Sequence, residues 1–259
     1  MELDWGQTVF GGPWGFLAAC GVIFLCNLVY VLLGFGAGML AVGMLAALFP
    51  DIRDVVVILL VLVFPAEGWI VARSREHIRW KGVGLILVGV AVGVPLGSWA
   101  LSHWDTGWLL VGLGLFLLLA GGTFLLLPEE ARVRWPRSAA PTVGLMSGFL
   151  SGLFGTSGPP LAVYFHLGPW DKREFRGHMM AVFLAMTVVR VPTYALVGLF
   201  SAPRLVSGLM LLPAAILGAV AGQHLHVRIP DRAFRRGVAL GLLALGVVLL
   251  RRSMMAGSL

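Results

Sequence analysis

GLFGTSGPP at residues 152–160 and GFGAG at residues 34–38 interrupt two hydrophobic stretches of the sequence, one in each half. The backbone N–H and C=O groups that such a break releases at membrane depth find no partners in lipid. Breaks of this kind therefore persist only where they line a cavity that is enclosed by protein or filled with water. Two breaks at corresponding positions of two halves indicate a transport site.

The composition places the chain among polytopic α-helical membrane proteins. Of its 259 residues, 59% are hydrophobic and 12% are charged, and apolar runs long enough to cross a bilayer recur from end to end. The net charge of +7 comes from basic residues in short loops, where insertion topology and lipid headgroups account for them better than nucleic acid does. We therefore expect membrane lipids, and no nucleic acid, as partners.

Apolar runs bounded by charged residues, proline or glycine define eight elements. In a first half, residues 1–130, we expect a broken element at 14–49 and helices at 55–72, 82–101 and 107–127. A second half, residues 131–259, repeats this order with a broken element at 142–168 and helices at 178–199, 204–226 and 236–250. The arms of the second broken element are about eleven or twelve residues long, too short to cross about 30 Å of hydrocarbon, which predicts a re-entrant hairpin.

The distribution of loop charges favours this hairpin. If the element at 142–168 enters and returns on one side, the loops of one face hold fourteen Lys and Arg residues against four on the other. If it crosses completely, the split is ten against eight, which gives almost no orientation signal. The positive-inside rule thus predicts a second break that enters from the cytoplasm. Residues 1–13 contain no Lys or Arg, so the first break is either a re-entrant hairpin or a kinked full span.

The two halves share several landmarks. Gly93-Val94-Pro95-Leu96-Gly97 corresponds to Gly218-Ala219-Val220-Ala221-Gly222, and Pro65 corresponds to Pro192. A hairpin followed by three crossings inverts the next copy of the repeat. We therefore predict two inverted repeats whose breaks meet near the middle of the membrane, where transporters of this kind bind their substrates.

The second break offers hydroxyls and backbone amides to an anion. Thr156 and Ser157 can cap the returning helix, and Pro159 suits its first position. A helix N-terminus attracts anions, so these hydroxyls and the amides of Gly155 and Gly158 are candidate ligands.

The first break offers little beyond its backbone. It would contribute mainly the amides of Gly36, Ala37 and Gly38. For both breaks the alternative is that the glycines only permit close packing of helices.

Arg190 lies about a dozen residues into the helix expected at 178–199, too deep for a loop charge. A guanidinium at that depth is costly enough to mark a functional site, and its fork of donors suits oxyanions. We predict that Arg190 binds the anion. The alternative is a structural role on backbone carbonyls exposed near Pro192.

Four further residues are candidates for ion coupling or for supporting the anion site: Asn27, Tyr30, Glu67 and Tyr194. Glu67 could carry a coupling proton, but pairing with Arg73 or Arg75 at the membrane interface is the simpler interpretation. For Asn27 and Tyr30 the alternative is hydrogen bonding between helices. Either H⁺ or Na⁺ could be the coupling ion.

Catalytic and metal-binding motifs of the HExxH, GxSxG, Walker and paired-Cys types are absent from the sequence. We therefore expect a protein that is not an enzyme and that binds neither a cofactor nor a metal. Besides a transporter for an oxyanion, three interpretations stay open: a carrier for a small carboxylate or other anion, an anion channel, and an intramembrane enzyme or assembly factor.

The chain resembles the sulfite exporter TauE/SafE family in its length, its two four-element halves and its breaks, GFGAGML at 34–40 and SGLFGTSGPPLAVYF at 151–165. The resemblance implies movement of sulfite or an organosulfonate across the bacterial inner membrane. With the inverted repeats, it predicts a secondary transporter that works by alternating access with the anion between the two breaks. The sequence departs from the family pattern at Thr156-Ser157, where glycine is frequent, and by lacking a proline after the first break. The direction of transport, the coupling ion and the oligomeric state are left open.

Overall fold

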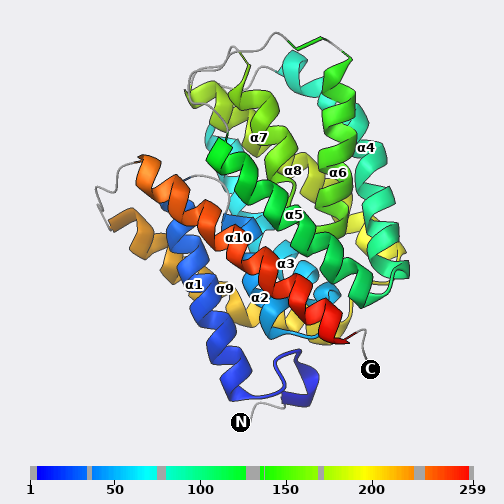
Figure 1. The fold of residues 1–259 in the computed structure, drawn as a ribbon, viewed down its shortest axis with the longest axis vertical. Helices are drawn as coiled ribbons and strands as arrows, with labels where there is room; N and C mark the ends of the chain where they lie inside the picture. Colours follow the sequence, from blue (N-terminus) through cyan, green and yellow to red (C-terminus); the bar gives the residue numbers. More distant parts are fainter. Residues whose placement is uncertain are drawn as a thin grey trace. The chain divides into compact units, whose positions relative to one another are not determined.

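A computed structural model of the chain describes residues 5–33, 37–74, 80–126, 135–136, 138–168, 172–224 and 231–256. Its regular elements over these residues are all helices, as Figure 1 shows. They are η1 (Trp5–Gln7), α1 (Pro13–Leu33), α2 (Ala37–Leu48), α3 (Ile52–Ser74), α4 (Trp80–His103), α5 (Thr106–Leu126), α6 (Ala139–Phe154), α7 (Gly158–His166), α8 (Lys172–Leu196), α9 (Ala202–His224) and α10 (Asp231–Ala256). The predicted all-α class is confirmed.

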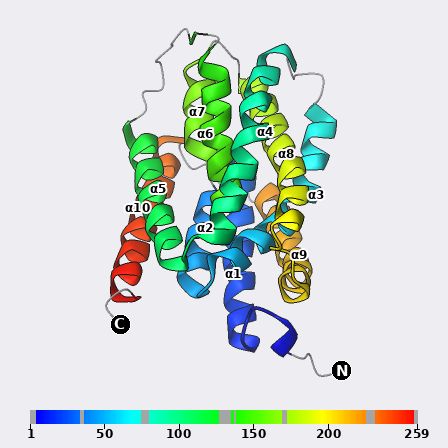
Figure 2. The same cartoon turned by 90° about the vertical axis from the view of Figure 1, so that its right-hand side faces the viewer.

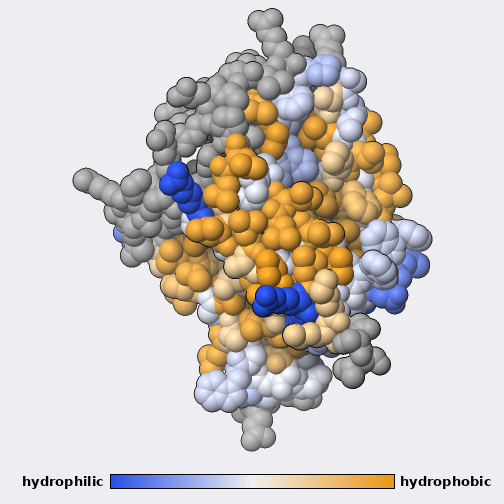
Figure 3. All heavy atoms as spheres, in the orientation of Figure 1, coloured by the Kyte–Doolittle hydropathy of each residue, from blue (hydrophilic) through white to orange (hydrophobic). Residues whose placement is uncertain are grey.

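Several of these helices have the length and the apolar surface that a bilayer requires. In the part of the chain that the structure describes, five helices are long and apolar enough to cross a membrane: α4, α5, α8, α9 and α10. Large apolar side chains lie exposed on them, and Figure 3 shows such a surface over α5 and α10. Leu119 and Leu126 of α5, for example, are 72% and 83% exposed. A surface of this kind needs lipid around it, which confirms a polytopic membrane protein.

Two helices extend beyond the predicted apolar runs. The helix expected at 178–199 is α8, which begins at Lys172, and the helix expected at 236–250 is α10, which covers 231–256. Hydropathy marks only the part of a helix that lipid surrounds. Charged residues can continue the helix into water, because its backbone hydrogen bonds do not depend on side-chain polarity. Residues 172–177, which precede the helix expected at 178–199, are therefore helical.

The second predicted break interrupts the helical structure, but its arms differ in length from the prediction. The break between α6 and α7 lies at residues 155–157, and the arms have 16 and 9 residues rather than about eleven or twelve each. At 1.5 Å per residue, these arms are about 24 and 14 Å long, so neither reaches across about 30 Å. Residues 34–36 of the first predicted break lie outside the described residues, which continue with α2 at Ala37.

The chain divides into two compact units. Unit 1 contains residues 1–62, 104–126 and 200–259, and unit 2 contains residues 63–103 and 127–199. In unit 1, α1 packs against α9 and α5 packs against α10; in unit 2, α4 packs against α6 and α8. Each unit thus combines helices from both halves of the sequence.

The contact between α4 and α6 in unit 2 depends on glycines. Figure 2 shows the two helices side by side, and each turns glycines toward the backbone of the other. A Cβ atom on Gly93 would lie 2.3 Å from the carbonyl oxygen of Leu145, and one on Gly144 would lie 2.0 Å from that of Ile86. Such distances exclude any side chain, so small residues allow these backbones to approach.

Unit 1 contains a corresponding contact between α1 and α9. A Cβ atom on Gly218 of α9 would lie 2.3 Å from the carbonyl oxygen of Phe24 in α1. Gly218 and Gly93 are the residues that the comparison of the two halves aligns. Each packs on the first helix of the broken element from the opposite half, which supports the repeat; its inversion stays a prediction.

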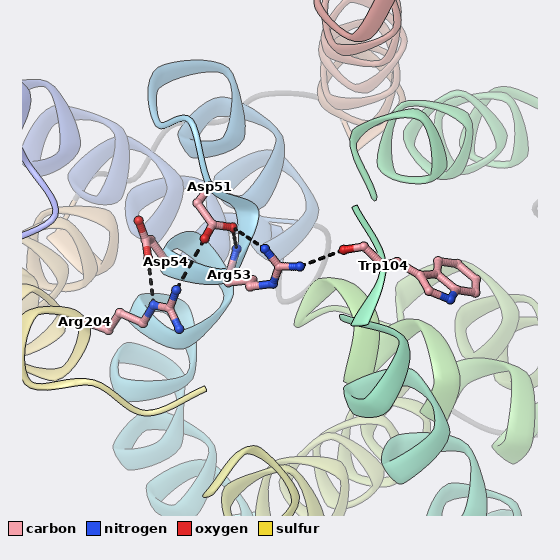
Figure 4. A network of polar contacts seen from close by, with 5 residues as sticks. All are labelled: Asp51, Arg53, Asp54, Trp104 and Arg204. Atoms are coloured by element: carbon pink, nitrogen blue, oxygen red, sulfur yellow. Dashed lines mark hydrogen bonds and ion pairs between the residues drawn. The ribbon is translucent and has the colours of Figure 1, made fainter. Parts of the chain in front are cut away.

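A network of ion pairs and hydrogen bonds lies at the start of α3 within unit 1 (Figure 4). Asp51 precedes α3 and accepts a hydrogen bond from the backbone N–H of Arg53 at 2.9 Å, as a helix N-cap does. Arg204, at the start of α9, donates to Asp54 at 2.7 Å and pairs with Asp51 at 3.4 Å. Arg53 donates to the carbonyl oxygen of Trp104 at 2.7 Å. The network thus connects the starts of α3 and α9 with the segment between α4 and α5.

Candidate functional site

A stripe of polar side chains follows one face of α8 in unit 2. Thr187, Arg190 and Tyr194 are spaced by three and four residues, which places them on one side of a helix. Their exposed fractions are 0, 2 and 0%. Since buried polar groups need partners, the groups that these three side chains meet define the site.

The guanidinium of Arg190 binds the last turn of α6. Its Nη1 donates to the carbonyl oxygen of Ser151 at 3.4 Å, and its Nη2 donates to the Thr187 hydroxyl at 2.9 Å. Its Nε is buried and has no hydrogen-bond partner among the described residues. Arg190 therefore meets a backbone carbonyl, as the structural alternative expects, but that carbonyl belongs to α6, and one donor stays open.

Tyr194 fixes the same turn of α6. Its hydroxyl donates to the carbonyl oxygen of Gly152 at 2.8 Å. Carbonyls in the last turn of a helix have no partners within the helix and carry partial negative charge, so a guanidinium and a hydroxyl suit them. Gly155 then ends α6 with a φ of 73°, the left-handed conformation that favours glycine at this position.

The break continues through residues 156 and 157 to α7. Ser157 is the N-cap residue of α7 and only 2% exposed, but its side chain makes no capping hydrogen bond. Gly158 is the first helical residue, so Pro159 takes the second position rather than the predicted first. Proline is tolerated there because N–H groups of the first turn have no acceptor within the helix. Ser157 thus brings a hydroxyl to the break that the cap does not use.

Glu67 of α3 lies with the polar groups of α8. It is 9% exposed, and its carboxylate interacts with the Arg190 charge and the Thr187 hydroxyl. Its Oε2 has no hydrogen-bond partner within the described part of the chain. Glu67 is thus buried, whereas the simpler interpretation expected it at the membrane interface; its pairing with Arg73 or Arg75 is not tested, because the side chains of those two arginines lie outside the described residues. Distance from a helix end had suggested an interface, but burial depends on what packs around the helix.

The first break lies in unit 1 and is described only in part. Gly36 lies outside the described residues, Ala37 begins α2, and Gly38 is exposed in the first turn of that helix. Asn27 donates to the carbonyl oxygen of Ile23 in its own helix at 2.9 Å rather than to another helix. Tyr30 belongs to α1, and its side chain is not described.

Three hydroxyls at or beside the site, those of Thr187, Ser98 and Thr193, were not predicted. Ser98 of α4 donates to the carbonyl oxygen of Val94 at 2.8 Å and lies 3.2 Å from the Thr193 hydroxyl of α8. The spacing of Thr187 from Arg190 is a signal that the sequence contains, because it marks one helix face. Ser98 has no such signal, since its contact depends on how α4 meets α8.

Nearly the whole chain matches one protein family. The family described as Sulfite exporter TauE/SafE matches residues 19–249. The chain belongs to the sulfite exporter TauE/SafE family. TauE/SafE proteins are membrane transporters, so the chain is a multi-pass transporter of the inner membrane and not an enzyme. This confirms the family that the two breaks predicted.

Two curated relatives belong to the same group of transporters. The "Probable sulfite/organosulfonate exporter TauE" of Cupriavidus necator is 26% identical over 214 residues, covering 81% of this chain and 83% of the relative. The "Probable inner membrane transporter protein TsaS" of Comamonas testosteroni is 29% identical over 175 residues, covering 67% of this chain and 73% of the relative. No solved structure matches the chain.

Proposed function

We propose that this TauE/SafE protein is a secondary transporter for a small sulfur-containing oxyanion, sulfite or an organosulfonate, and that it works by alternating access. The observation that carries the proposal is the open Nε donor of Arg190, a guanidinium that is 2% exposed. A buried cation with an unused donor is suited to bind an anion. The relative from Cupriavidus necator, described as a probable sulfite/organosulfonate exporter, supports the sulfur oxyanion as the substrate class.

The second break lies next to Arg190 along α6. Ser151, which accepts from Arg190, precedes Gly155 by one helical turn and also accepts a hydrogen bond from its N–H at 2.9 Å. The proposed ligands are Arg190 with the amides and hydroxyls of Thr156, Ser157 and Gly158, since the Gly155 N–H predicted as a ligand donates to Ser151 instead. These donors suit the three oxygens of a sulfonate, and the N-terminus of α7 adds a favourable dipole. The amides of Gly36, Ala37 and Gly38 stay a prediction from the sequence.

The inverted repeats that we propose give a structural basis for alternating access. The matching contacts of Gly93 with α6 and of Gly218 with α1 support a repeated arrangement. Transporters built from inverted repeats carry their site in broken helices and expose it to each side in turn. We propose the same cycle for this protein.

A binding screen tests the substrate class. Purified protein is heated with sulfite, sulfate, thiosulfate, 2-hydroxyethanesulfonate or the carboxylate 3-hydroxypropanoate. A ligand at 100 times its Kd stabilises the folded state by about 2.7 kcal/mol, which raises Tm measurably. We expect a shift with sulfite or 2-hydroxyethanesulfonate. A shift with the carboxylate alone would assign the protein to a different class of carrier.

The variant Arg190→Ala tests the site itself. We expect it to lose the ligand-induced rise in Tm, because the buried donor is gone. Arg204→Ala is the matched control, since Arg204 pairs with Asp51 and Asp54 in unit 1 and should leave the rise intact. An unchanged rise in Arg190→Ala would contradict the proposed site.

A further inference from the structure

Glu67 and Arg190 are a buried pair of opposite charge that no hydrogen bond fully satisfies. They are 9% and 2% exposed and interact electrostatically. The Oε2 of Glu67 and the Nε of Arg190 nevertheless each lack a hydrogen-bond partner among the described residues. Buried ionic groups are normally satisfied at every donor and acceptor. The pair therefore has one open acceptor and one open donor, which a proton and an anion can fill.

The charged surroundings of Glu67 come from α8. Arg190 is the charge that faces it, and Thr187 and Tyr194 add hydroxyls next to that guanidinium. The acidic residue of α8, Glu174, lies in its first turn, about 24 Å along the helix from Arg190. Among the described acidic side chains of unit 2, Glu67 alone is thus close enough to balance Arg190.

The other helices of unit 2 bring few titratable groups. α6 contains none, and those of α4, Lys81 and His103, lie near its two ends. α7 carries Tyr164, which stacks on Trp135, and His166 in its last turn. Among the described side chains, the charge state of the site therefore depends mainly on Glu67 and Arg190, together with any bound anion.

We propose that Glu67 binds the proton that accompanies the anion; this inference rests on the proposed function. In the empty site, ionised Glu67 balances the charge of Arg190. When a monoanion binds Arg190, Glu67 takes one proton from water, and the site again carries no net charge. One anion and one proton bind together and leave together.

Electrostatics explains why the two binding events are linked. Two negative groups beside one cation repel strongly in a buried site, because Coulomb interactions there are only weakly screened. The proton on Glu67 removes this repulsion. Movement of one monoanion with one proton transfers no net charge, so a pH gradient drives it and the membrane potential does not.

Proton uptake on binding tests the inference directly. The solubilised wild-type protein is mixed with 2-hydroxyethanesulfonate in weak buffer, and a pH indicator reports protons taken from solution. This sulfonate does not titrate near neutral pH, so any uptake belongs to the protein. We expect close to one proton per bound anion, and an affinity that falls about tenfold per pH unit once Glu67 is ionised in the empty site.

The variant Glu67→Gln keeps the shape of the side chain without its titration. We expect it to bind the sulfonate with no proton uptake and with an affinity independent of pH. Glu174→Gln is the matched control, which should take up protons as the wild type does. The same uptake in Glu67→Gln as in the wild type would overturn the inference, and so would wild-type binding without uptake, a result that needs no variant to fold.

The outcomes also separate this inference from the proposed function. If the wild type does not bind the sulfonate, or if Arg190→Ala binds it normally, the anion site is wrong and the coupling fails with it. If binding depends on Arg190 but takes up no proton, the transporter stands and Glu67 is only a fixed counter-charge.

Discussion

The hydroxyl of Ser157 is expected to contribute to binding of the anion but little to the stability of the fold. Ser157 occupies the N-cap of α7 without making a capping hydrogen bond, although it is buried. We expect Ser157→Ala to change the free energy of unfolding by less than about 0.5 kcal/mol, below the usual loss for a capping serine. Affinity for 2-hydroxyethanesulfonate should fall about tenfold, because a hydrogen bond to a charged group is lost. Calorimetric titration measures the affinity; a large loss of stability with unchanged affinity would show a cap instead.

The hydroxyl of Tyr194, in contrast, is expected to contribute to the stability of the fold. Its hydroxyl donates to the carbonyl oxygen of Gly152, and its ring is fully buried. Tyr194→Phe should lower the free energy of unfolding by about 1–2 kcal/mol, since a buried carbonyl loses its donor. Thermal unfolding in detergent measures the change. Tyr164→Phe is the control, because the contacts of Tyr164 that the structure describes involve its ring, and a loss as large as in Tyr194→Phe would contradict the role of the hydroxyl.

The position of an arginine far inside an apolar run predicted Arg190 as a candidate anion ligand. It did not predict the residues that Arg190 contacts. A guanidinium far inside an apolar run is visible in the sequence. Its contact with Ser151 is not, because the two residues are 39 positions apart and meet only when α6 packs beside α8. Glu67 shows the same limit: its position near a helix end suggested an interfacial pair, whereas packing buries it beside Arg190.

The contact between α4 and α6 depends on the absence of side chains. A Cβ atom on Gly93 would lie 2.3 Å from a backbone oxygen of α6, so Gly93→Leu must push the two helices apart. We expect a loss of about 3 kcal/mol or more, seen as a large fall in Tm or a failure to purify folded protein. Gly84→Leu is the control on the same helix, because a Cβ atom there meets nothing within 4 Å. Equal losses in the two variants would contradict the close approach.

The ionic network at the start of α3 is expected to contribute little. The side chains of Arg204, Asp51 and Asp54 are 17, 32 and 19% exposed, so water and salt screen them. Arg204→Ala should cost about 1 kcal/mol or less, and the difference in Tm from the wild type should shrink in 0.5 M salt. A large loss that salt does not change would show that the network is part of the buried core.

The break between α6 and α7 was predicted more accurately than the start of α8. Glycine, hydroxyl and proline residues marked the interruption between α6 and α7, because these residue types favour left-handed or capping conformations. The start of α8 at Lys172 was missed, since charged residues that continue a helix into water look like a loop in a hydropathy pattern.

Orientation across the membrane is a prediction for the whole molecule. Fourteen basic loop residues are expected on the cytoplasmic face against four on the other. In a background with both native cysteines replaced, Ser138→Cys should react with an impermeant thiol reagent only from the cytoplasm, and Ser201→Cys only from outside. Labelling of both from one side would show that the element at 142–168 crosses the membrane completely.

Counterflow in proteoliposomes tests whether the protein is a sulfonate carrier whose site contains Arg190. Vesicles loaded with unlabelled 2-hydroxyethanesulfonate are placed in labelled sulfonate, and a carrier with one alternating site accumulates label transiently. We expect this accumulation for the wild type and for Arg204→Ala, and none for Arg190→Ala. Equal accumulation with Arg190→Ala, or none with the folded wild type, would contradict a sulfonate carrier built around Arg190.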